Sequence, residues 1–548
     1  MPVNARWPTT RGRLLDNWGL GIVLLAYACL RLALVNSIPL NSDEPQHAHV
    51  VWAWSQGLVP YRDVFDNHAP LFHMLYAPLL RAMGETSYVL TWLRIAIIPV
   101  AVAALAMVAF IGRRLWGGRV ALWALLLICA CPPYLREAGT FRTDALWAMV
   151  WIATVACATS GRWTVRRAFW FGLLLGTSFA VSMKTSLLAA GLAIAWVFVA
   201  ASLPRHHRPS PTTCLRSLGA VLGGAAIVPL LIVGWVALRG GLLAMHYGVV
   251  AHNMLPGLGR THGAHWRMPL MLLLLGVLAL LVRRAVHSAD DAPLSARRAI
   301  VVASAVAYML LLFGTWPLLS RQDMLPSIPL LALGLAGWWQ TNSRPSFAWL
   351  PLPLAIAGFA LMLHRNPPSR DLLAQQRATL ADVLATTSDR DFVMDDKGAS
   401  IYRMRPFYFA LEGITRARIE RGLIVDDIPQ RLVTTKTYVV WLGWLPVKDA
   451  QFVSATYLPV RNGLMVAGHD FGLLGDNVTA PAHILLPGSY ALATGSGSDP
   501  YSARLDGSAY VEPRWLPAGP HALTVPRSGR YALVWQPAAR LLPWTGEQ

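Results

Sequence analysis

The segment from Asn41 to His73 concentrates the side chains of this sequence that could carry out proton transfer. It opens with two adjacent carboxylates, Asp43 and Glu44, directly after an apolar stretch long enough to cross a membrane. Ionisable groups beside a lipid surface are usually functional, and a carboxylate can accept a proton from a hydroxyl. Capping of a helix is the structural alternative, but a cap needs one such residue rather than two. We therefore predict Asp43 as a general base and Glu44 as a catalytic residue that orients the base or the substrate.

A second dense polar group follows at residues 61–68, immediately before Pro70. Aromatic rings alternate there with charges, a mixture suited to holding a sugar or a phosphate group. A solvated loop could have the same composition. A further acid, Asp144, begins a later apolar stretch two residues after Arg142. The predicted substrate-binding residues are Tyr61, Arg62, Asp63, Asp66, His68 and Asp144.

Several basic residues near the ends of apolar stretches are candidates for binding a phosphate group. Lys184 stands out because the chain has only four lysines and the other three follow residue 390. An ammonium is a compact point charge suited to phosphate. The alternatives are weak local ion pairs or side chains that reach from the membrane to its surface. The predicted phosphate-binding residues are Lys184, Arg142, Arg321, Arg94 and Arg31.

The composition indicates a membrane protein with a polar C-terminal part. The chain has 548 residues, of which 55% are hydrophobic and 14% charged, whereas soluble domains are about 25% charged. Apolar stretches recur up to residue 363 and then stop. The net charge of +19 would suit a nucleic-acid-binding protein, but the arginines cluster in alternate loops between apolar stretches. That distribution reports membrane orientation, so we predict no nucleic-acid partner.

The elements that must position these residues are about eleven membrane-spanning helices, with the amino terminus inside the cell. The loop 39–87 then lies outside, and its segments 44–56 and 70–83 are too short to span and are expected at the membrane surface. The tail also lies outside because the number of spans is odd. The predicted spans are about 19–38, 88–111, 120–135, 145–160, 168–183, 186–203, 217–238, 269–282, 299–313, 325–340 and 346–363.

Three regions follow from this pattern: a transmembrane catalytic domain at 1–363, a mixed α/β segment at 364–450 and a β-sandwich-like domain at 451–548. Residues 371–388 have the apolar spacing of a helix. Short alternating segments from residue 452 onward, beginning with FVSATYLPV, are typical of strands separated by turns. Tyr501, Tyr510 and Trp515 could stack on a sugar, although aromatic residues at strand spacing more often belong to the core.

No metal site and no cofactor are predicted. The five cysteines lack the spacing of a metal cluster. Four histidines crowd residues 240–267, but without the spacing of a zinc-binding helix. These are His246, His252, His262 and His265.

With these residues described, the sequence resembles the GT-C superfamily of glycosyltransferases that use polyprenyl-phosphate sugars. It looks most like families 39 and 83, the protein O-mannosyltransferases and the lipid A aminoarabinose transferase. Asp43-Glu44 in the first outer loop and the YRDVFDNHAPL stretch at 61–71 carry most of the resemblance. Arg142 and Asp144, Lys184-Thr185 and Arg321-Gln322 also fit. Ala69-Pro70 departs from the pair of prolines that relatives often show.

The resemblance implies an inverting transferase that moves a hexose or pentose from a polyprenyl-phosphate donor to an acceptor hydroxyl at the outer membrane face. Asp43 would be the general base, and the acceptor would be a lipid, a polysaccharide or a protein of the cell envelope. The partners would be membrane lipid, the lipid-linked donor and that acceptor. The expected location is the bacterial inner membrane, with the active site and the tail on the periplasmic side.

The alternative is a transporter or flippase of lipid-linked sugars. Such a protein needs polar residues at the middle of the membrane, often on broken helices in repeated halves. The polar residues of this sequence gather instead at one face of the predicted membrane. The sequence therefore favours sugar transfer.

Overall fold

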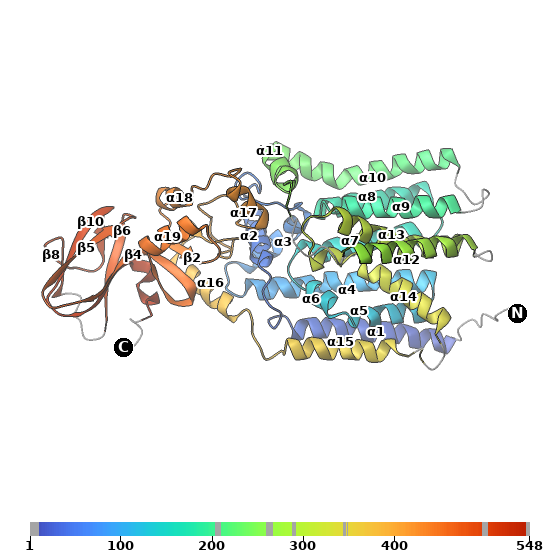
Figure 1. The fold of residues 1–548 in the computed structure, drawn as a ribbon, viewed down its shortest axis with the longest axis horizontal. Coiled ribbons are helices and arrows are strands. Elements are labelled where there is room, and N and C mark those ends of the chain that lie inside the picture. The colour runs from blue at the N-terminus through green and yellow to red at the C-terminus, as the bar shows by residue number, and fades with distance from the viewer. Residues whose placement is uncertain are drawn as a thin grey trace.

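The structure is a computed structural model that describes residues 10–202, 210–258, 267–287, 292–343, 347, 349–495 and 502–543. A bundle of helices forms one part, and a region rich in strands lies beyond one end of that bundle (Figure 1). The predicted fold class, a helical part followed by a C-terminal β-sheet region, is confirmed.

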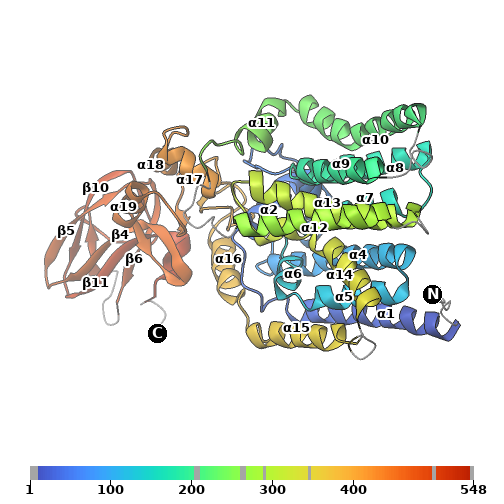
Figure 2. The ribbon, with the colours of Figure 1, turned by 45° about the vertical axis from the view of Figure 1, so that its right-hand side comes forward.

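Each predicted membrane-spanning segment coincides with a helix of the bundle. Helices satisfy their own backbone hydrogen bonds, which an apolar stretch in lipid requires. The helices lie side by side, with α1 and α15 at one edge and α10 at the other in both views (Figures 1 and 2). They are α1 (Thr10–Ala33), α4 (Val89–Leu115), α5 (Gly118–Cys129), α7 (Thr143–Thr159), α8 (Val165–Val181), α9 (Thr185–Ser202), α10 (Pro211–Leu238), α12 (Arg267–His287), α13 (Ala292–Thr315), α14 (Ile328–Asn342) and α15 (Pro351–Arg365).

Within the described residues, four of these helices are long and apolar enough, by length and composition, to cross a membrane: α4, α9, α10 and α13. Large apolar side chains such as Trp18, Leu230 and Leu238 are exposed on the outside of the bundle, where lipid would cover them. The number of spans and the inside position of the amino terminus stay predictions.

Short elements connect the helices at the end of the bundle that faces the C-terminal region. Two of them, α2 (Asp43–Ser55) and α3 (Leu71–Met83), match the two short helices predicted in the loop 39–87. They lie between the bundle and the C-terminal region (Figure 1). The others are α6 (Pro132–Glu137), α11 (Leu242–His246), η2 (Tyr247–Ala251) and η4 (Arg321–Met324).

The expectation that residues 44–56 lie on the membrane surface is wrong, because α2 is enclosed by protein. Every residue from Glu44 to Ala53 is buried. On one side His49 Nδ1 hydrogen-bonds the carbonyl oxygen of Ile401 at 2.8 Å, which attaches α2 to the C-terminal region. A helix covered on all sides has no one-sided apolar stripe, which a surface helix would have. The prediction of a membrane contact rested instead on the aromatic residues of this segment.

The C-terminal region contains a seven-stranded and a four-stranded sheet over one apolar core. The larger sheet has the order β1-β2-β4-β11-β6-β9 with β3 paired to β4, and the smaller has the order β5-β10-β7-β8. Along β10, buried residues alternate with partly exposed ones, as one face packs on the core. The strands are β1 (Val393–Met394), β2 (Val439–Trp441), β3 (Tyr457–Pro459), β4 (Leu464–Leu474), β5 (Val478–Ile484), β6 (Gly488–Thr494), β7 (Arg504–Leu505), β8 (Ser508–Ala509), β9 (Arg514–Leu516), β10 (Gly519–Val525) and β11 (Gly529–Trp535).

Helices cover the part of this region nearest the bundle. The helix predicted at 371–388 is α16 (Ala374–Thr386). The segment FVSATYLPV was predicted as a strand, but its first half belongs to α19 (Val447–Thr456) and only β3 is extended. β1 and β2 precede residue 450 and join β4 and β11 after it, so the segments 364–450 and 451–548 share one sheet. The remaining elements are α17 (Gly413–Glu420), α18 (Ile428–Thr434), η6 (Arg461–Gly463) and η8 (Gln536–Leu541).

Candidate active site

Asp43 is the first residue of α2 and is held between two cations from distant parts of the chain. Its Oδ1 accepts a hydrogen bond from Lys397 Nζ at 2.9 Å, and its Oδ2 pairs with Arg142 Nη1. Asn41 Oδ1 accepts from Arg142 Nη1 and from the Asp43 backbone N–H, both at 3.0 Å. Ser42, the residue that caps α2, makes no side-chain capping bond. Asp43 is therefore placed for charge interactions at the helix end, with its side chain 29% exposed.

The electrostatic surroundings keep Asp43 ionised. Burial alone would raise the pKa of this carboxyl, but the charges of Arg142 and Lys397 outweigh burial and hold the pKa well below its usual range. Arg142 is affected in the opposite direction: burial lowers the pKa of its guanidinium, but Asp144 and Asp43 together raise it above its usual value.

A second predicted phosphate-binding residue, Lys184, lies in the same part of the molecule as Arg142. Arg142 Nε also donates to Asp144 Oδ2 at 2.9 Å, and Lys184 Nζ pairs with the buried Asp323. The turn that carries Lys184 is attached to α7, because Trp147 Nε1 donates to Thr185 Oγ1 at 2.9 Å. We call Asp43, Arg142, Asp144, Lys184, Asp323 and Lys397 the outer cluster.

Arg321 lies beside this cluster, at the start of a turn whose next two residues are buried. It begins η4, two residues before Asp323, and its side chain is exposed. The next residue, Gln322, donates from Nε2 to Glu137 Oε2 at 2.8 Å, which fixes η4 against α6. Arg321 thus offers an accessible guanidinium next to the Lys184–Asp323 pair.

Glu44, although adjacent to Asp43, is fully buried and forms a bidentate pair with Arg94. Arg94 Nε and Nη2 donate to its two carboxylate oxygens at 2.7 and 2.6 Å. Arg94 also donates to the carbonyl oxygens of Val35, Ile38 and Pro39. All five guanidinium N–H groups are therefore used within the protein. We call this Glu44–Arg94 pair the clasp, since it joins α2 to α4 and to the segment that follows α1.

Two predicted phosphate-binding residues, Arg94 of the clasp and Arg31, lie inside the protein. Arg31 is buried, and its Nη1 donates to the carbonyl oxygen of Leu135 at 2.6 Å. The packing assigns Arg31 and Arg94 to holding helices together and does not bring them to the outer cluster. A phosphate contact for either residue stays a prediction that this packing disfavours.

Residues 61–64 form a strained turn at the outer face. Tyr61 has a positive φ of 73°, which is costly for a residue with a large side chain. Its hydroxyl donates to the carbonyl oxygen of His68 at 2.7 Å, and its own carbonyl oxygen accepts from the hydroxyl of Tyr408. Arg62 and Asp63 pair with each other at 2.7 Å on the surface. The turn therefore presents an ion pair to solvent, while the Tyr61 side chain is buried.

Asp66 and His68, also predicted to bind substrate, belong to a buried cluster of histidines. Asp66 Oδ1 lies 3.0 Å from His68 Nδ1, and Asp66 Oδ2 lies 3.3 Å from His73 Nδ1. His73 Nε2 lies 2.9 Å from Nδ1 of His47, which comes from α2. Asp66, His47 and His73 are fully buried, and His68 is partly exposed.

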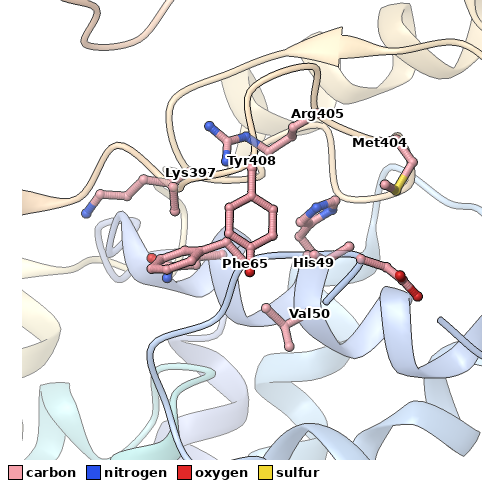
Figure 3. Close-up of a pocket in the computed structure, with 11 residues that line it drawn as sticks. His49, Val50, Phe65, Lys397, Met404, Arg405 and Tyr408 are labelled. Carbon is pink, nitrogen blue, oxygen red and sulfur yellow. The ribbon is translucent and has the colours of Figure 1, made fainter. Parts of the chain in front are cut away.

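A recess between α2 and the C-terminal region adjoins the outer cluster (Figure 3). Its volume is about 340 Å³, mouth included. Figure 3 shows the Phe65 and Tyr408 rings close together, with Lys397 at one side and Arg405 above them. The lining residues are Gln46, His49, Val50, Asp63, Val64, Phe65, Lys397, Met404, Arg405, Tyr408 and Ala410.

The sequence alone did not point to the C-terminal contribution to this site. Lys397, Arg405 and Tyr408 lie more than 330 residues from α2 along the chain. One signal was present: Lys397 is one of only four lysines, in a tail that has no other lysine before residue 430.

The remaining predicted residues lie elsewhere. His252 is buried, with Nε2 2.9 Å from Glu412 Oε1, and His246 is exposed. Within the described residues, no group of three or more His, Cys, Asp or Glu side chains could hold a metal ion. In the tail, Tyr510 is buried and accepts a hydrogen bond from the Leu492 N–H, while Trp515 is exposed. His262, His265 and Tyr501 lie outside the described residues.

Comparison with known proteins supports the fold. No protein-family profile and no curated protein sequence matches this chain. Among solved structures, ArnT from Cupriavidus metallidurans in the apo state matches with a TM-score of 0.58 at 14% identity, over 82% of this chain and 98% of ArnT. ArnT bound to undecaprenyl phosphate matches over the same shares, with a TM-score of 0.41 at 14% identity. The apo oligosaccharyltransferase of Archaeoglobus fulgidus matches with a TM-score of 0.47 at 12% identity, over 77% of this chain and 69% of that protein.

The likeness to apo ArnT shows that this chain shares the fold of that protein. The match covers nearly all of ArnT. At 14% identity it establishes the fold alone, so the chemistry has to be argued from the site.

Proposed function

We propose that this protein is an inverting glycosyltransferase that moves a sugar from a polyprenyl-phosphate donor to an acceptor hydroxyl at the outer face of a membrane. The observation that carries the proposal is the pairing of Asp43 with Arg142 and Lys397 at the end of the helix bundle. It combines a carboxylate that can take a proton with cations that can hold a phosphate.

The donor phosphate would bind to cations of the outer cluster. Arg142, Lys184 and Lys397 each have a carboxylate partner in this structure, and Arg321 is exposed beside them. Charge-assisted bonds from such cations stabilise the negative charge that develops on a departing phosphate. ArnT, whose apo form shares this fold, has also been solved with undecaprenyl phosphate bound. We propose the same kind of lipid phosphate as the leaving group here.

The reaction would be a single displacement. The acceptor oxygen forms a bond to the anomeric carbon, the bond between that carbon and the phosphate oxygen breaks, and polyprenyl phosphate leaves. Asp43 takes the proton of the acceptor hydroxyl. A carboxylate with a strongly lowered pKa is a weak base, so the donor phosphate must first draw Arg142 or Lys397 away from Asp43. Donor binding would in this way activate the base.

The acceptor would enter through the recess between α2 and residues 397–410. Its lining combines the Lys397 ammonium with the Phe65 and Tyr408 rings, which suits a polar, sugar-containing or anionic acceptor. Asp63 and the neighbouring Arg62 lie at this face and remain proposed substrate contacts. We propose a lipid, polysaccharide or protein acceptor of the cell envelope, reached on the periplasmic side of a bacterial inner membrane.

The proposal is tested with full-length protein in proteoliposomes that contain polyprenyl-phosphate hexose or pentose carrying a labelled sugar. The expected result is a labelled acceptor together with free polyprenyl phosphate in equal amounts. The proposal is overturned if the protein moves the intact donor between leaflets while the sugar–phosphate bond stays unbroken, because that behaviour defines a transporter of lipid-linked sugars.

A further inference from the structure

Behind the outer cluster, three buried side chains from three segments lie in a row, with a hydrogen bond between the two histidines and an ion-pair contact to the aspartate. Asp66 Oδ2 lies 3.3 Å from His73 Nδ1, and His73 Nε2 lies 2.9 Å from His47 Nδ1. The row joins the loop before α3, α3 itself and α2. The far end of the row is His47 Nε2, which is buried and has no hydrogen-bond partner among the described residues.

The tautomers of the two histidines follow from the charge of Asp66. An ionised carboxylate can only accept hydrogen bonds, and Asp66 Oδ1 already accepts from the His68 backbone N–H at 3.0 Å. A lone pair on His73 Nδ1 would face this carboxylate at 3.3 Å, so the charge of Asp66 favours the tautomer with the proton on Nδ1 and the lone pair at Nε2. His47 must then donate from Nδ1, and its Nε2 is left as an unprotonated acceptor. Both histidines are neutral at pH 7, because burial holds the pKa of His47 well below 6.5 and lowers that of His73 to about 4.

The position of His47 connects the row to the candidate base. His47 and Asp43 are four residues apart on α2 and so lie on the same face, one helical turn from each other. The charged and titratable groups that face His47 are His68, His73, Arg142 and Lys397, together with Asp66 through His73. Two of them, Arg142 and Lys397, are the cations paired with Asp43.

We propose that His47 Nε2 receives the proton that sugar transfer displaces, with His73 and Asp66 as positioning residues that hold His47 in the accepting tautomer. The inference rests on the proposed function. The acceptor O–H proton passes to the Asp43 carboxylate as the new glycosidic bond forms, and from Asp43 to His47 Nε2. Asp43 is then ionised again for the next turnover, and the imidazolium releases its proton to water.

His47 Nε2 is one of several buried side-chain atoms without a hydrogen-bond partner among the described residues, and its position one helical turn from Asp43 sets it apart. Nearly all buried polar atoms in proteins are hydrogen-bonded, and leaving one unpaired is unfavourable. An apolar residue of similar size could fill the same space as His47. An unpartnered nitrogen at the end of an oriented row, one turn from the base, is the arrangement that a transient proton acceptor requires.

The test measures sugar transfer by full-length His47→Ala, His47→Gln and His73→Gln across pH, with and without added imidazole. We expect His47→Ala to lose about 100-fold in turnover, the lower part of the range for acid–base catalysis, with little change in the KM for the donor. Imidazole at high concentration should restore His47→Ala at least tenfold. Wild-type turnover should fall only well below pH 6.5, because burial holds the pKa of His47 well below that value, and this acid limb should be absent in His47→Ala.

The controls separate a proton-transfer role from a structural one. His252→Ala removes another buried histidine paired with a carboxylate, outside this row, and should show no response to imidazole. Thermal unfolding of His47→Gln checks that the fold is kept. The relay is overturned if folded His47 variants keep wild-type turnover, or if they lose it while imidazole and the acid limb make no difference. Absence of any sugar transfer by the wild-type protein would overturn the proposed function and this inference together.

Discussion

The outer cluster and the clasp begin at adjacent residues of one helix, and both are built from arginine–carboxylate pairs. In the clasp, Glu44 is fully buried and every N–H of Arg94 has a fixed partner. In the outer cluster, Asp43 is 29% exposed, and its partners come from two separate parts of the chain. The clasp therefore has no partner to exchange, whereas the outer cluster can exchange a carboxylate for a phosphate.

The difference shows that burial and the number of partners, more than residue type, distinguish a structural ion pair from one that can take part in catalysis here. A buried ion pair is strongly destabilised when one member is removed, while a partly exposed pair contributes little to stability. Changes in the clasp should affect unfolding first. Changes in the outer cluster should affect turnover first.

The largest effect on stability is expected from Arg94→Met, which leaves the Glu44 carboxylate buried without its counter-charge. We expect the free energy of unfolding to fall by ~3–5 kcal/mol, measured by thermal or denaturant unfolding in detergent. The double variant Arg94→Met with Glu44→Gln should recover part of this loss, because no uncompensated charge remains. A single variant within ~1 kcal/mol of the wild type would contradict the assignment of the clasp.

A smaller effect, on activity alone, is expected from Lys397→Ala. The change removes one of the two cations on Asp43 and one wall of the recess. We expect a loss of ~10- to 100-fold in kcat/KM for sugar transfer, equivalent to ~1.5–3 kcal/mol for a charged hydrogen bond. Lys436→Ala, at an exposed lysine of the same region, is the matched control and should keep full activity. Equal behaviour of the two variants would exclude a role for the C-terminal region in the site.

Gly398→Ala should have a still smaller effect, which depends on the contact between α2 and the C-terminal region. Gly398 has a φ of +84°, and an added Cβ would lie 2.7 Å from His49 Cβ on α2. We expect a loss of ~1–2 kcal/mol in stability from the backbone strain, and a several-fold drop in turnover as Lys397 is displaced. Gly422→Ala has a similar φ of +68° but meets no neighbouring atom. It should lose stability without losing turnover, and an equal loss of turnover in both would refute the displacement.

The smallest effect expected is the response of stability to pH at Asp43. A carboxyl whose pKa is lowered on folding contributes stability above its unfolded pKa, and this stability is lost as the pH falls through the folded value. The unfolded value is 3.8 and the folded value lies below it. The difference in unfolding free energy between the wild type and Asp43→Asn should therefore stay constant from pH 5 to 8 and shrink only in stronger acid. A change within the neutral range would show that Asp43 is not held by Arg142 and Lys397.

The sequence predicted the helices of the bundle well, because a long apolar stretch in lipid has to satisfy its own backbone hydrogen bonds, as a helix does. It also predicted that Asp43, Arg142 and Lys184 lie at one face of the membrane, because alternate loops of a helical bundle lie on the same side. It could not separate Asp43 from Glu44, because neighbours on a helix point about 100° apart and only tertiary packing decides which side is buried.

Contacts between residues far apart in the sequence were the main feature that could not be predicted. Lys397 reaches Asp43 across 354 residues, and no local pattern encodes such a pairing. His47 and His73 each lie in a helix whose composition suggested a membrane surface, so their contact depends on how α2 packs against α3. The segment FVSATYLPV has the composition of a strand, yet α19 begins before it and continues into it. Tertiary context overrode strand propensity there.

The most direct test of the central claim compares turnover by the wild type, Asp43→Asn and Asp371→Asn at saturating donor in proteoliposomes. Asp371 forms a surface ion pair with Arg377 in the C-terminal region and serves as the matched carboxylate control. We predict that Asp43→Asn stays folded and still binds the donor but loses at least ~100-fold in turnover, as removal of a general base requires. Asp371→Asn should keep full turnover. If Asp43→Asn transfers sugar within tenfold of the wild type, Asp43 is not the base and the division between the outer cluster and the clasp fails.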